Sequence, residues 1–191
     1  MRVSVAALLL ILIFTMIETE RLVLRRWRVD DAASLYKYAS DDRVSELALW
    51  PTHTSVDMSR EVIETVFIPN PHTLAIALKD TGEPVGCIGL VPDDDEHHAT
   101  VSSEREVGYW IGRPYWNKGI ASEALRALAA YCRATVGLDS LLITTDKRNA
   151  ASRRVAEKCG FMFVEEYVYD GIESCAYRLD LRAAGGKTKS T

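Results

Sequence analysis

The sequence has few cysteines, no surplus of positive charge and no apolar run of membrane-spanning length. The four cysteines are far apart and form no C-x-x-C pair, which argues against a zinc knuckle or a redox motif. We interpret them as small buried apolar residues: Cys87, Cys132, Cys159 and Cys175. The formal net charge of −4 removes the bulk attraction to phosphate backbones, so we expect no nucleic-acid partner. His97 and His98 follow an acidic run in a loop that we interpret as solvated, and we predict no metal.

The N-terminal segment needs separate treatment. After Arg2 it carries the apolar run VAALLLILIFTMI, which is shorter than the ~20 residues that cross a bilayer and lacks an A-x-A cleavage site. We therefore expect translation to start at Met16, which makes residues 1–15 an upstream extension. The alternative is a membrane-tethered form that retains these residues.

The length of 191 residues favours one domain, expected over 16–181, followed by a flexible tail at 182–191. The pattern along the chain predicts strand, two helices, three strands, helix, strand, helix and two strands. Strands are expected at 21–27, 73–78, 85–91, 106–111, 141–145, 161–169 and 174–181. Helices are expected from Val29 to Tyr38, from about Ser55 to Phe67 with a Thr54/Asp57 capping box, from Gly119 to Gly137, and from the N-cap Asn149 to Gly160. This order predicts an α+β fold and disfavours a regular βαβ dinucleotide fold.

The segment RPYWNKGIASE joins a strand directly to an amphipathic helix. A helix N-terminus carries unpaired N–H groups and the positive end of the helix dipole, so it suits a pyrophosphate. Gly119 allows close approach of the backbone, and Lys118 adds charge at the rim. A plain strand-to-helix turn is the alternative, because one glycine is weak evidence for a site.

Three stretches of the sequence resemble the GNAT superfamily, and within it the ribosomal-protein-alanine (Rim-type) branch of N-acetyltransferases. They are the opening MIETERLVLR, the segment EVGYWIGRPYWNKGIASEAL and the segment NAASRRVAEKCGF. The second resembles the family's acyl-CoA signature Q/R-x-x-G-x-G/A, and the third its Asn-x-x-Ser helix start. The first glycine of the signature is Asn117 here. Asparagine tolerates positive φ better than most residues, so we expect the turn to survive.

The resemblance implies a central mixed, mostly antiparallel sheet with helices on both faces, splayed between the fourth and fifth strands. It implies that loop amides hold the pyrophosphate of acetyl-CoA, that a backbone N–H near 109–111 faces the thioester oxygen, and that Asn149 binds the pantetheine arm. Asn149 also suits an N-cap, and we expect the two roles to be divided between its backbone and side chain. Ser152 resembles the residue that protonates the departing thiolate, or it is a first-turn helix residue. The implied coenzyme-binding residues are Tyr109, Trp110, Ile111, Asn117, Lys118, Gly119, Ile120, Ala121, Ser122, Asn149 and Ser152.

A general base is harder to identify. Glu106 lies on the strand beside the expected cleft and is our first candidate, with Glu104 next, although a strand glutamate facing solvent is equally ordinary. Val155, Ala156 and Cys159 follow Ser152, so the tyrosine acid of some relatives is absent. Aromatic residues that either line an acceptor pocket or fill the core are left unassigned: Tyr36, Trp50, Tyr109 and Trp110.

Together these features predict a cytoplasmic N-acetyltransferase that moves acetyl from acetyl-CoA, as co-substrate, to a primary amine by direct attack in a ternary complex. The acceptor is a protein N-terminus or a small-molecule amine. The alternative is a non-catalytic acyl-CoA sensor. The acidic run Asp93–Glu96, within the loop 92–103, would attract a basic acceptor or is simply solvated. The oligomeric state is not encoded in these patterns.

Overall fold

The computed structural model describes residues 16–48, 50–92 and 103–182. The expectations for residues 1–15, for the acidic loop with His97 and His98, and for the tail beyond residue 182 lie outside the described residues. The chain divides into two compact units. The first unit comprises Met1–Gly89 and Tyr109–Ala124, and the second comprises Leu90–Gly108 and Leu125–Thr191.

The first unit contains an antiparallel run of strands in chain order. They are β1 (Met16–Glu18), β2 (Leu22–Arg26), β3 (Thr73–Leu78) and β4 (Pro84–Leu90), followed by the end of β5 (Glu104–Ile111). The predicted strands appear within two residues of their expected bounds, and β1 is an addition. Every residue of β4 is buried, which explains its continuous apolar sequence.

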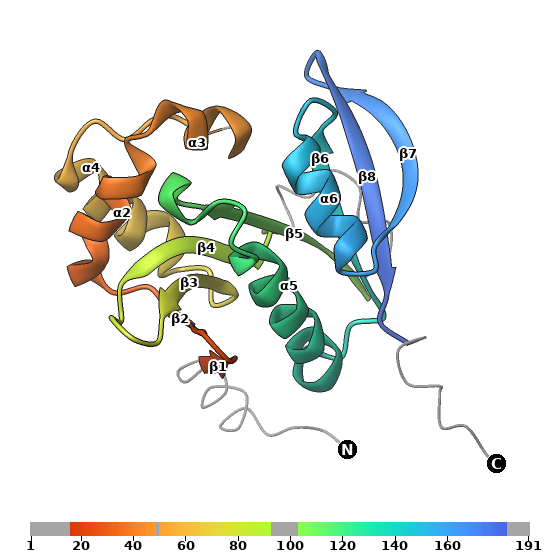
Figure 1. The fold of residues 1–191 in the computed structure, drawn as a ribbon, viewed down its shortest axis with the longest axis horizontal. Helices are drawn as coiled ribbons and strands as arrows, with labels where there is room; N and C mark the ends of the chain where they lie inside the picture. Colours follow the sequence, from red (N-terminus) through yellow and green to blue (C-terminus); the bar gives the residue numbers. More distant parts are fainter. Residues whose placement is uncertain (1–15, 49, 93–102, 183–191) are drawn as a thin grey trace. The chain divides into compact units, whose positions relative to one another are not determined.

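Short helices follow β2 and precede β3 in the first unit (orange to ochre in Figure 1). They are η1 (Val29–Asp31), α2 (Ala32–Ala39), α3 (Asp42–Ala48), α4 (Val56–Val62) and the π-helical turn η2 (Ile63–Phe67). The helix α3 was not predicted. The capping prediction was wrong by one residue, because the side chain of Ser55, not Thr54, accepts the N–H of Met58 at 3.0 Å.

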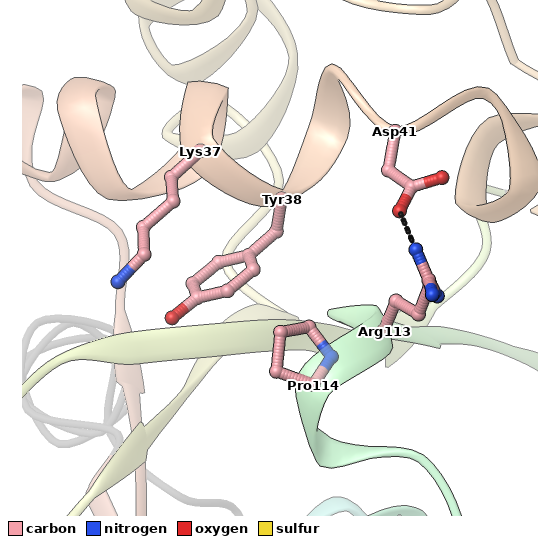
Figure 2. A pocket seen from close by; sticks show the side chains of 5 residues that line it. All are labelled: Lys37, Tyr38, Asp41, Arg113 and Pro114. Carbon is pink, nitrogen blue, oxygen red and sulfur yellow. Dashed lines mark ion pairs between the residues drawn. The ribbon is translucent and has the colours of Figure 1, made fainter.

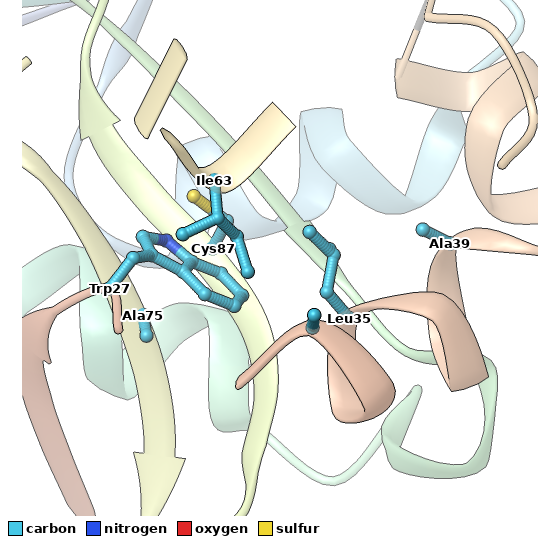
Figure 3. Close-up of a cluster of buried hydrophobic side chains, with 7 residues drawn as sticks. Trp27, Leu35, Ala39, Ile63, Ala75 and Cys87 are labelled. Carbon is cyan, nitrogen blue, oxygen red and sulfur yellow. The ribbon is translucent and has the colours of Figure 1, made fainter. Parts of the chain in front are cut away.

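The core of the first unit forms where these helices cover the strands (Figure 3). Trp27 packs against Phe67 with ring centroids 5.0 Å apart, and Leu35, Ile63 and Cys87 close the cluster. Burial raises the pKa of the Cys87 thiol to about 12. This cysteine is therefore a neutral core residue, as the sequence predicted.

The second unit has its own strands and helices (blue-green to blue in Figure 1). The start of β5 pairs in parallel with β6 (Ser140–Asp146), and β6 pairs antiparallel with β8 (Ile172–Asp180), which pairs antiparallel with β7 (Met162–Tyr169). The β7–β8 turn, Asp170-Gly171, has φ values of 48° and 78°, as a two-residue type I′ hairpin requires. Helix α5 (Ile120–Tyr131) begins in the first unit and continues as η4 (Cys132–Val136) to a left-handed Gly137. Helix α6 (Ala150–Lys158) is followed by Cys159 and the left-handed Gly160.

The predicted mixed, mostly antiparallel α+β architecture is confirmed, with β5–β6 as its parallel pair. The parallel ladder covers only Glu104–Glu106 against Ser140–Leu142, although both strands continue for several residues beyond it. The divergence expected between the fourth and fifth predicted strands therefore begins after Glu106 and Leu142. Among the described residues, no helix combines the length and apolar composition needed to cross a bilayer.

Gly86 marks the tightest backbone approach in the first unit. A Cβ atom there would lie 2.5 Å from the carbonyl oxygen of Trp110 and 2.9 Å from Ile111 Cδ1. We expect Gly86→Ala to lower the free energy of unfolding by about 2 kcal/mol, because the backbone cannot move aside cheaply. Urea denaturation measures this loss. Gly108→Ala is the matched strand control, since its Cβ would meet only Val91 Cγ2 at 3.6 Å, and equal losses in the two variants would contradict the prediction.

Candidate active site

The loop between β5 and α5 carries two residues in the left-handed region. After the short helix η3 (Arg113–Tyr115), Trp116 is extended, Asn117 has φ of 60° and Gly119 has φ of 77°. The expectation that asparagine takes the positive φ of the missing glycine is confirmed. Both reversals are needed to turn the chain from the strand into the helix within a few residues.

Helix α5 begins immediately after this loop. Its first backbone bond runs from the N–H of Glu123 to the carbonyl of Gly119, at 3.0 Å. As a general property of a helix start, the first N–H groups of a helix have no acceptor within the helix itself. The helix dipole adds partial positive charge at the same place, so the loop and first turn suit an anion.

A carboxylate from the same helix ties the loop to the start of the chain. The two Oε atoms of Glu123 accept the Thr19 hydroxyl, the Arg21 backbone N–H at 2.9 Å and the Arg21 guanidinium at 2.7 Å. The same guanidinium donates to the carbonyl of Lys118 at 3.0 Å. We call Thr19, Arg21 and Glu123 the loop clamp. Burial acts to raise the pKa of Glu123, but the bonds from Thr19 and Arg21 outweigh it, and the pKa lies below its ordinary value.

Aromatic side chains fix the other end of the loop. The indole N–H of Trp116 donates to the carbonyl of Ile111 at 2.7 Å, and the Lys118 ammonium lies 5.3 Å from the centroid of the Tyr115 ring. Asn117 and Lys118 are exposed, while Ile120 and Ser122 are buried. The loop therefore presents its left-handed turn to solvent and anchors itself through the residues on either side.

An open cavity of about 470 Å³ lies beside the beginning of the loop, between α2 and η3 (Figure 2). It is lined by Lys37, Tyr38, Asp41, Arg113 and Pro114. Its charges are paired, because Lys37 Nζ lies 2.7 Å from Glu83 and Arg113 lies 3.7 Å from Asp41.

None of the predicted coenzyme residues lines this cavity. Tyr38 packs so closely on Gly112 that a Cβ atom there would lie 2.5 Å from its ring, and it meets Tyr115 edge-on at 5.9 Å. We interpret this wall as support for the loop.

In the second unit, Asn149 is the N-cap of α6, as predicted. Its side-chain Oδ1 accepts the backbone N–H of Ser152 at 3.0 Å. The cap thus uses the side-chain oxygen, and the second expected role of Asn149, at the pantetheine arm, stays a prediction. The preceding Asp146 is buried, and bonds from Arg148 outweigh burial and hold the pKa of its carboxyl below the ordinary value.

Glu106 and Glu104 are both buried on the second unit's sheet. Glu106 accepts the hydroxyl of Thr144. Glu104 instead accepts Arg178 Nε at 2.6 Å and the Ser140 hydroxyl at 2.7 Å. The carboxylate of Glu104 is thus engaged by a guanidinium and a hydroxyl, and both glutamates remain candidates for the base.

Glu106 and α6 lie on opposite faces of this sheet. Glu106 pairs with Leu142, and Leu142 pairs with Arg178, so these three side chains lie on one face of the sheet. Gly160, just after α6, lies against Leu179, whose side chain is on the opposite face because it is next to Arg178 in β8. The side chain of Tyr167 lies near Glu106, because both side chains form a hydrogen bond with Thr144. Burial, with a contribution from the negative charge of Glu106, raises the pKa of Tyr167.

The structure therefore brings Tyr109 to Ser122 together in the first unit and pairs Asn149 with Ser152 in the second. Sequence reasoning missed the loop clamp and the Thr144–Tyr167 pair. The sequence did contain a pointer to the loop clamp, because Thr19 and Arg21 lie in the opening stretch that carries the family resemblance. Among the described residues, no group of three or more His, Cys, Asp or Glu side chains is placed to hold a metal ion.

Two of the unassigned aromatic residues contact each other in the first unit. Trp50 and Trp110 meet edge-on with centroids 5.9 Å apart, and both pack against the hydrophobic core. Trp50 also contacts the ring of His53, a buried residue whose Nδ1 lies 2.7 Å from Ser59 Oγ. Burial lowers the pKa of His53, which favours the neutral ring. Trp50 and Trp110 thus serve the core of the first unit.

Comparison with known proteins gives consistent results. A family model described as an acetyltransferase (GNAT) domain matches residues 21–162. The N-acetyltransferase p20 of Bacillus licheniformis is 29% identical over 147 residues, which cover 75% of this chain and 80% of p20. A GNAT-family acetyltransferase structure from Bacillus anthracis superposes with a TM-score of 0.76 at 22% identity, covering 88% of this chain and 99% of that one. Mycobacterium smegmatis RimJ, solved in complex with CoA-disulfide, gives 0.68 at 21% identity, covering 86% and 84%.

The loop clamp predicts a pH-dependent contribution to stability. Because the pKa of Glu123 is lower in the folded chain than its ordinary 4.5, its contribution is complete above about pH 4.5 and is lost as the pH falls through the folded value. We expect Glu123→Gln to lower the free energy of unfolding by roughly 1 kcal/mol at pH 7, allowing for the exposed Arg21 partner, and by progressively less towards pH 3. Urea denaturation across this pH range measures the difference. Glu61→Gln, on the exposed side of α4, is the control, and a pH-independent loss in Glu123→Gln would contradict the assignment.

Proposed function

The chain belongs to the GNAT acetyltransferase family, and on this premise we propose that it transfers acetyl from acetyl-CoA to a primary amine by direct attack in a ternary complex. The observation that carries the proposal is the loop from Trp116 to Gly119, in which Asn117 and Gly119 are left-handed directly before the start of α5. The family membership already makes the protein an acetyltransferase. The donor, the acceptor and the roles of individual residues are the proposal, as is the cytoplasmic location.

We assign the pyrophosphate of the coenzyme to the loop and first turn of α5. The amides of Asn117 to Ser122 follow one another around the two left-handed residues, and the helix dipole favours negative charge there. Side-chain bulk at Gly119 is absent, so an anion can approach its backbone. The loop clamp holds these amides before the ligand arrives, which lowers the ordering cost of binding.

We assign the thioester carbonyl to a backbone amide at the end of β5. The N–H of Gly112 donates to the carbonyl of Val85 at 2.8 Å, so the backbone of Gly112 faces β4. In an antiparallel ladder alternate residues face the partner strand, so the amides of Tyr109 and Ile111 are directed to the other edge of β5. The indole bond of Trp116 to the Ile111 carbonyl agrees with this direction. An amide so directed suits an oxyanion-hole role.

For the second unit the resemblance supplies the roles. Asn149 is assigned to the pantetheine arm and Ser152 to the departing thiolate. Since Oδ1 of Asn149 caps α6, its side-chain NH₂ is the group assigned to the coenzyme. Glu106 is assigned as the general base that accepts the amine proton directly or through water, with Thr144 orienting its carboxylate.

The acceptor is proposed to be a primary amine on a protein N-terminus or on a small molecule. The resemblance of the sequence to the ribosomal-protein-alanine branch favours the protein N-terminus within this pair. A thiol-release assay with acetyl-CoA and a panel of amines, including N-terminal peptides and polyamines, tests the proposal. Release of CoA with acetylation of at least one amine is expected. Coenzyme binding by calorimetry without turnover on any amine would contradict it.

The coenzyme assignment predicts a selective effect at Gly119. Gly119→Ala and the control Gly137→Ala impose the same left-handed strain, since φ is 77° and 81° respectively, and both should lose about 1 kcal/mol of stability. Only Gly119→Ala should weaken acetyl-CoA binding, by roughly 10-fold or more, because it alone places a methyl group on the anion-facing backbone. Isothermal calorimetry, at a temperature where both variants are folded, measures the affinity of each variant for acetyl-CoA. Equal affinities in the two variants would remove the loop from the coenzyme site.

The thiolate assignment predicts a turnover effect at Ser152. Ser152→Ala should lower kcat about 100-fold with little change in acetyl-CoA affinity, because the lost hydroxyl acts on the leaving group and not on binding. Stopped assays with the best amine measure kcat, and calorimetry measures the affinity for acetyl-CoA. Ser55→Ala, which removes the N-cap of α4, is the control and should cost about 1 kcal/mol of stability without this loss. Unchanged turnover in Ser152→Ala would remove its proton-donor role.

A further inference from the structure

The strand β7 collects most of the exposed apolar side chains of the described residues. Among the described residues, eight large hydrophobic residues are exposed, and five of these eight lie in β7, in the second unit. Their exposed fractions run from 39% to 74%, for Met162, Phe163, Val164, Val168 and Tyr169. The exposed apolar side chains of the described residues are thus concentrated on one strand.

The same strand is the last in its sheet. The order β6–β8–β7 leaves one edge of β7 without a neighbour among the described strands. Edge strands are usually protected by proline, by lysine or other charged side chains, by a bulge or by a short length. MFVEEYVY is eight residues long and has neither proline nor lysine, and its protection is limited to Glu165, Glu166 and one bulge. Its one irregularity is a bulge between Phe163 and Glu165, at Val164.

We propose that β7 is the interface of a symmetric homodimer, in which the β7 strands of two copies pair antiparallel about a two-fold axis beside Glu166. Such an interface joins the same surface of both copies, so each residue on one side of the axis must suit its counterpart on the other. The sequence of β7 meets this condition.

If the bulged Val164 is left out of the count, the residues of β7 are arranged symmetrically about Glu166, so the strand can pair with a second copy of itself. Its register with β8 then places Met162 three positions before Glu166 and Tyr169 three positions after it, with Phe163 and Val168 two positions before and after. Antiparallel pairing about Glu166 sets Met162 opposite Tyr169 of the second copy, and Phe163 opposite Val168 of the second copy. Each pair shares a face, because Met162 and Tyr169 align with Arg178 and Ile172 on β8, and Phe163 and Val168 align with Tyr177 and Glu173.

The charge at the axis is partly neutralised within each copy by Lys147, which also lies 3.9 Å from Glu173. Two Glu166 side chains would face each other there, but the ammonium of Lys147 already donates to Glu166 at 2.7 Å. The hydrogen bond to Glu166 is the first of several causes that raise the pKa of Lys147. The acidic centre of the strand is therefore compatible with self-association, which an unpaired carboxylate would oppose.

The surface available is large enough for an interface. At their exposed fractions the five apolar side chains offer roughly 100 Å² each, or about 500 Å² per copy. Two copies therefore expose about 1,000 Å² of apolar side-chain surface along this strand, which is the upper limit of the apolar side-chain area that pairing can bury. A specific interface needs about this area, so polar and backbone atoms of the strand must contribute as well. A second copy is favoured over an unrelated partner because only a second copy exploits the symmetry of the strand.

Sedimentation velocity of the full chain, up to about 100 µM, tests the dimer. We expect the wild type to dimerise and Val168→Lys to dissociate at least 10-fold more readily, because it sets a charge against Phe163 of the second copy. Val66→Lys is the matched control, since Val66 is exposed to 55% and lies in the first unit, and it should dimerise like the wild type. Circular dichroism verifies that both variants are folded.

The register is tested separately through the charges at the axis. Lys147→Ala should weaken the dimer about 10-fold by leaving two facing carboxylates, and adding Glu166→Gln should restore it. A wild type that stays monomeric, a dimer unaffected by Val168→Lys, or an association unchanged by Lys147→Ala would overturn the proposal. A monomer whose β7 amides resist hydrogen exchange would instead place another segment of the chain on this edge.

Discussion

The bonds to the carboxylate of Glu123 determine the conformation of the loop before α5. One side chain in the first turn of α5 receives hydrogen bonds from Thr19 and Arg21, and Arg21 also holds the carbonyl of Lys118. Without these bonds a loop with two left-handed residues would have many alternatives of similar energy, since its tip is exposed. The clamp therefore converts a flexible connection into a fixed row of amides.

The clamp is also electrostatically consistent with the helix that carries it. A carboxylate in the first turn of a helix interacts favourably with the positive end of the dipole, and the guanidinium of Arg21 restores a positive charge near the loop. An anion approaching Asn117 and Gly119 thus meets amides backed by a cation. The same arrangement explains why Asn117 can replace a glycine, because the surrounding bonds hold the left-handed conformation that asparagine tolerates.

The sequence predicted what depends on neighbouring residues. The cap of α6 at Asn149 and the left-handed turn of Asn117 each follow from local backbone chemistry. The capping error of one residue arose because Thr54 and Ser55 both have a hydroxyl that satisfies the pattern. The helix α3 was missed because it is only seven residues long, which is too short for helical periodicity to be recognised.

Long-range contacts were beyond this reasoning. The Thr19–Glu123 bond joins residues 104 positions apart, and no periodicity reports it. The bond between Arg178 and Glu104 likewise joins residues 74 positions apart. Candidate acids and bases could be named from the sequence, but the side chains that bind them could not.

The buried cysteines make each unit's core separately observable. Cys87 lies in the core of the first unit and Cys132 in the second, and burial raises the pKa of both thiols to about 12. A thiol this poorly ionised reacts with alkylating reagents only when its surroundings open. The rates at which the two are labelled would therefore report the opening of the two units independently, without any introduced probe.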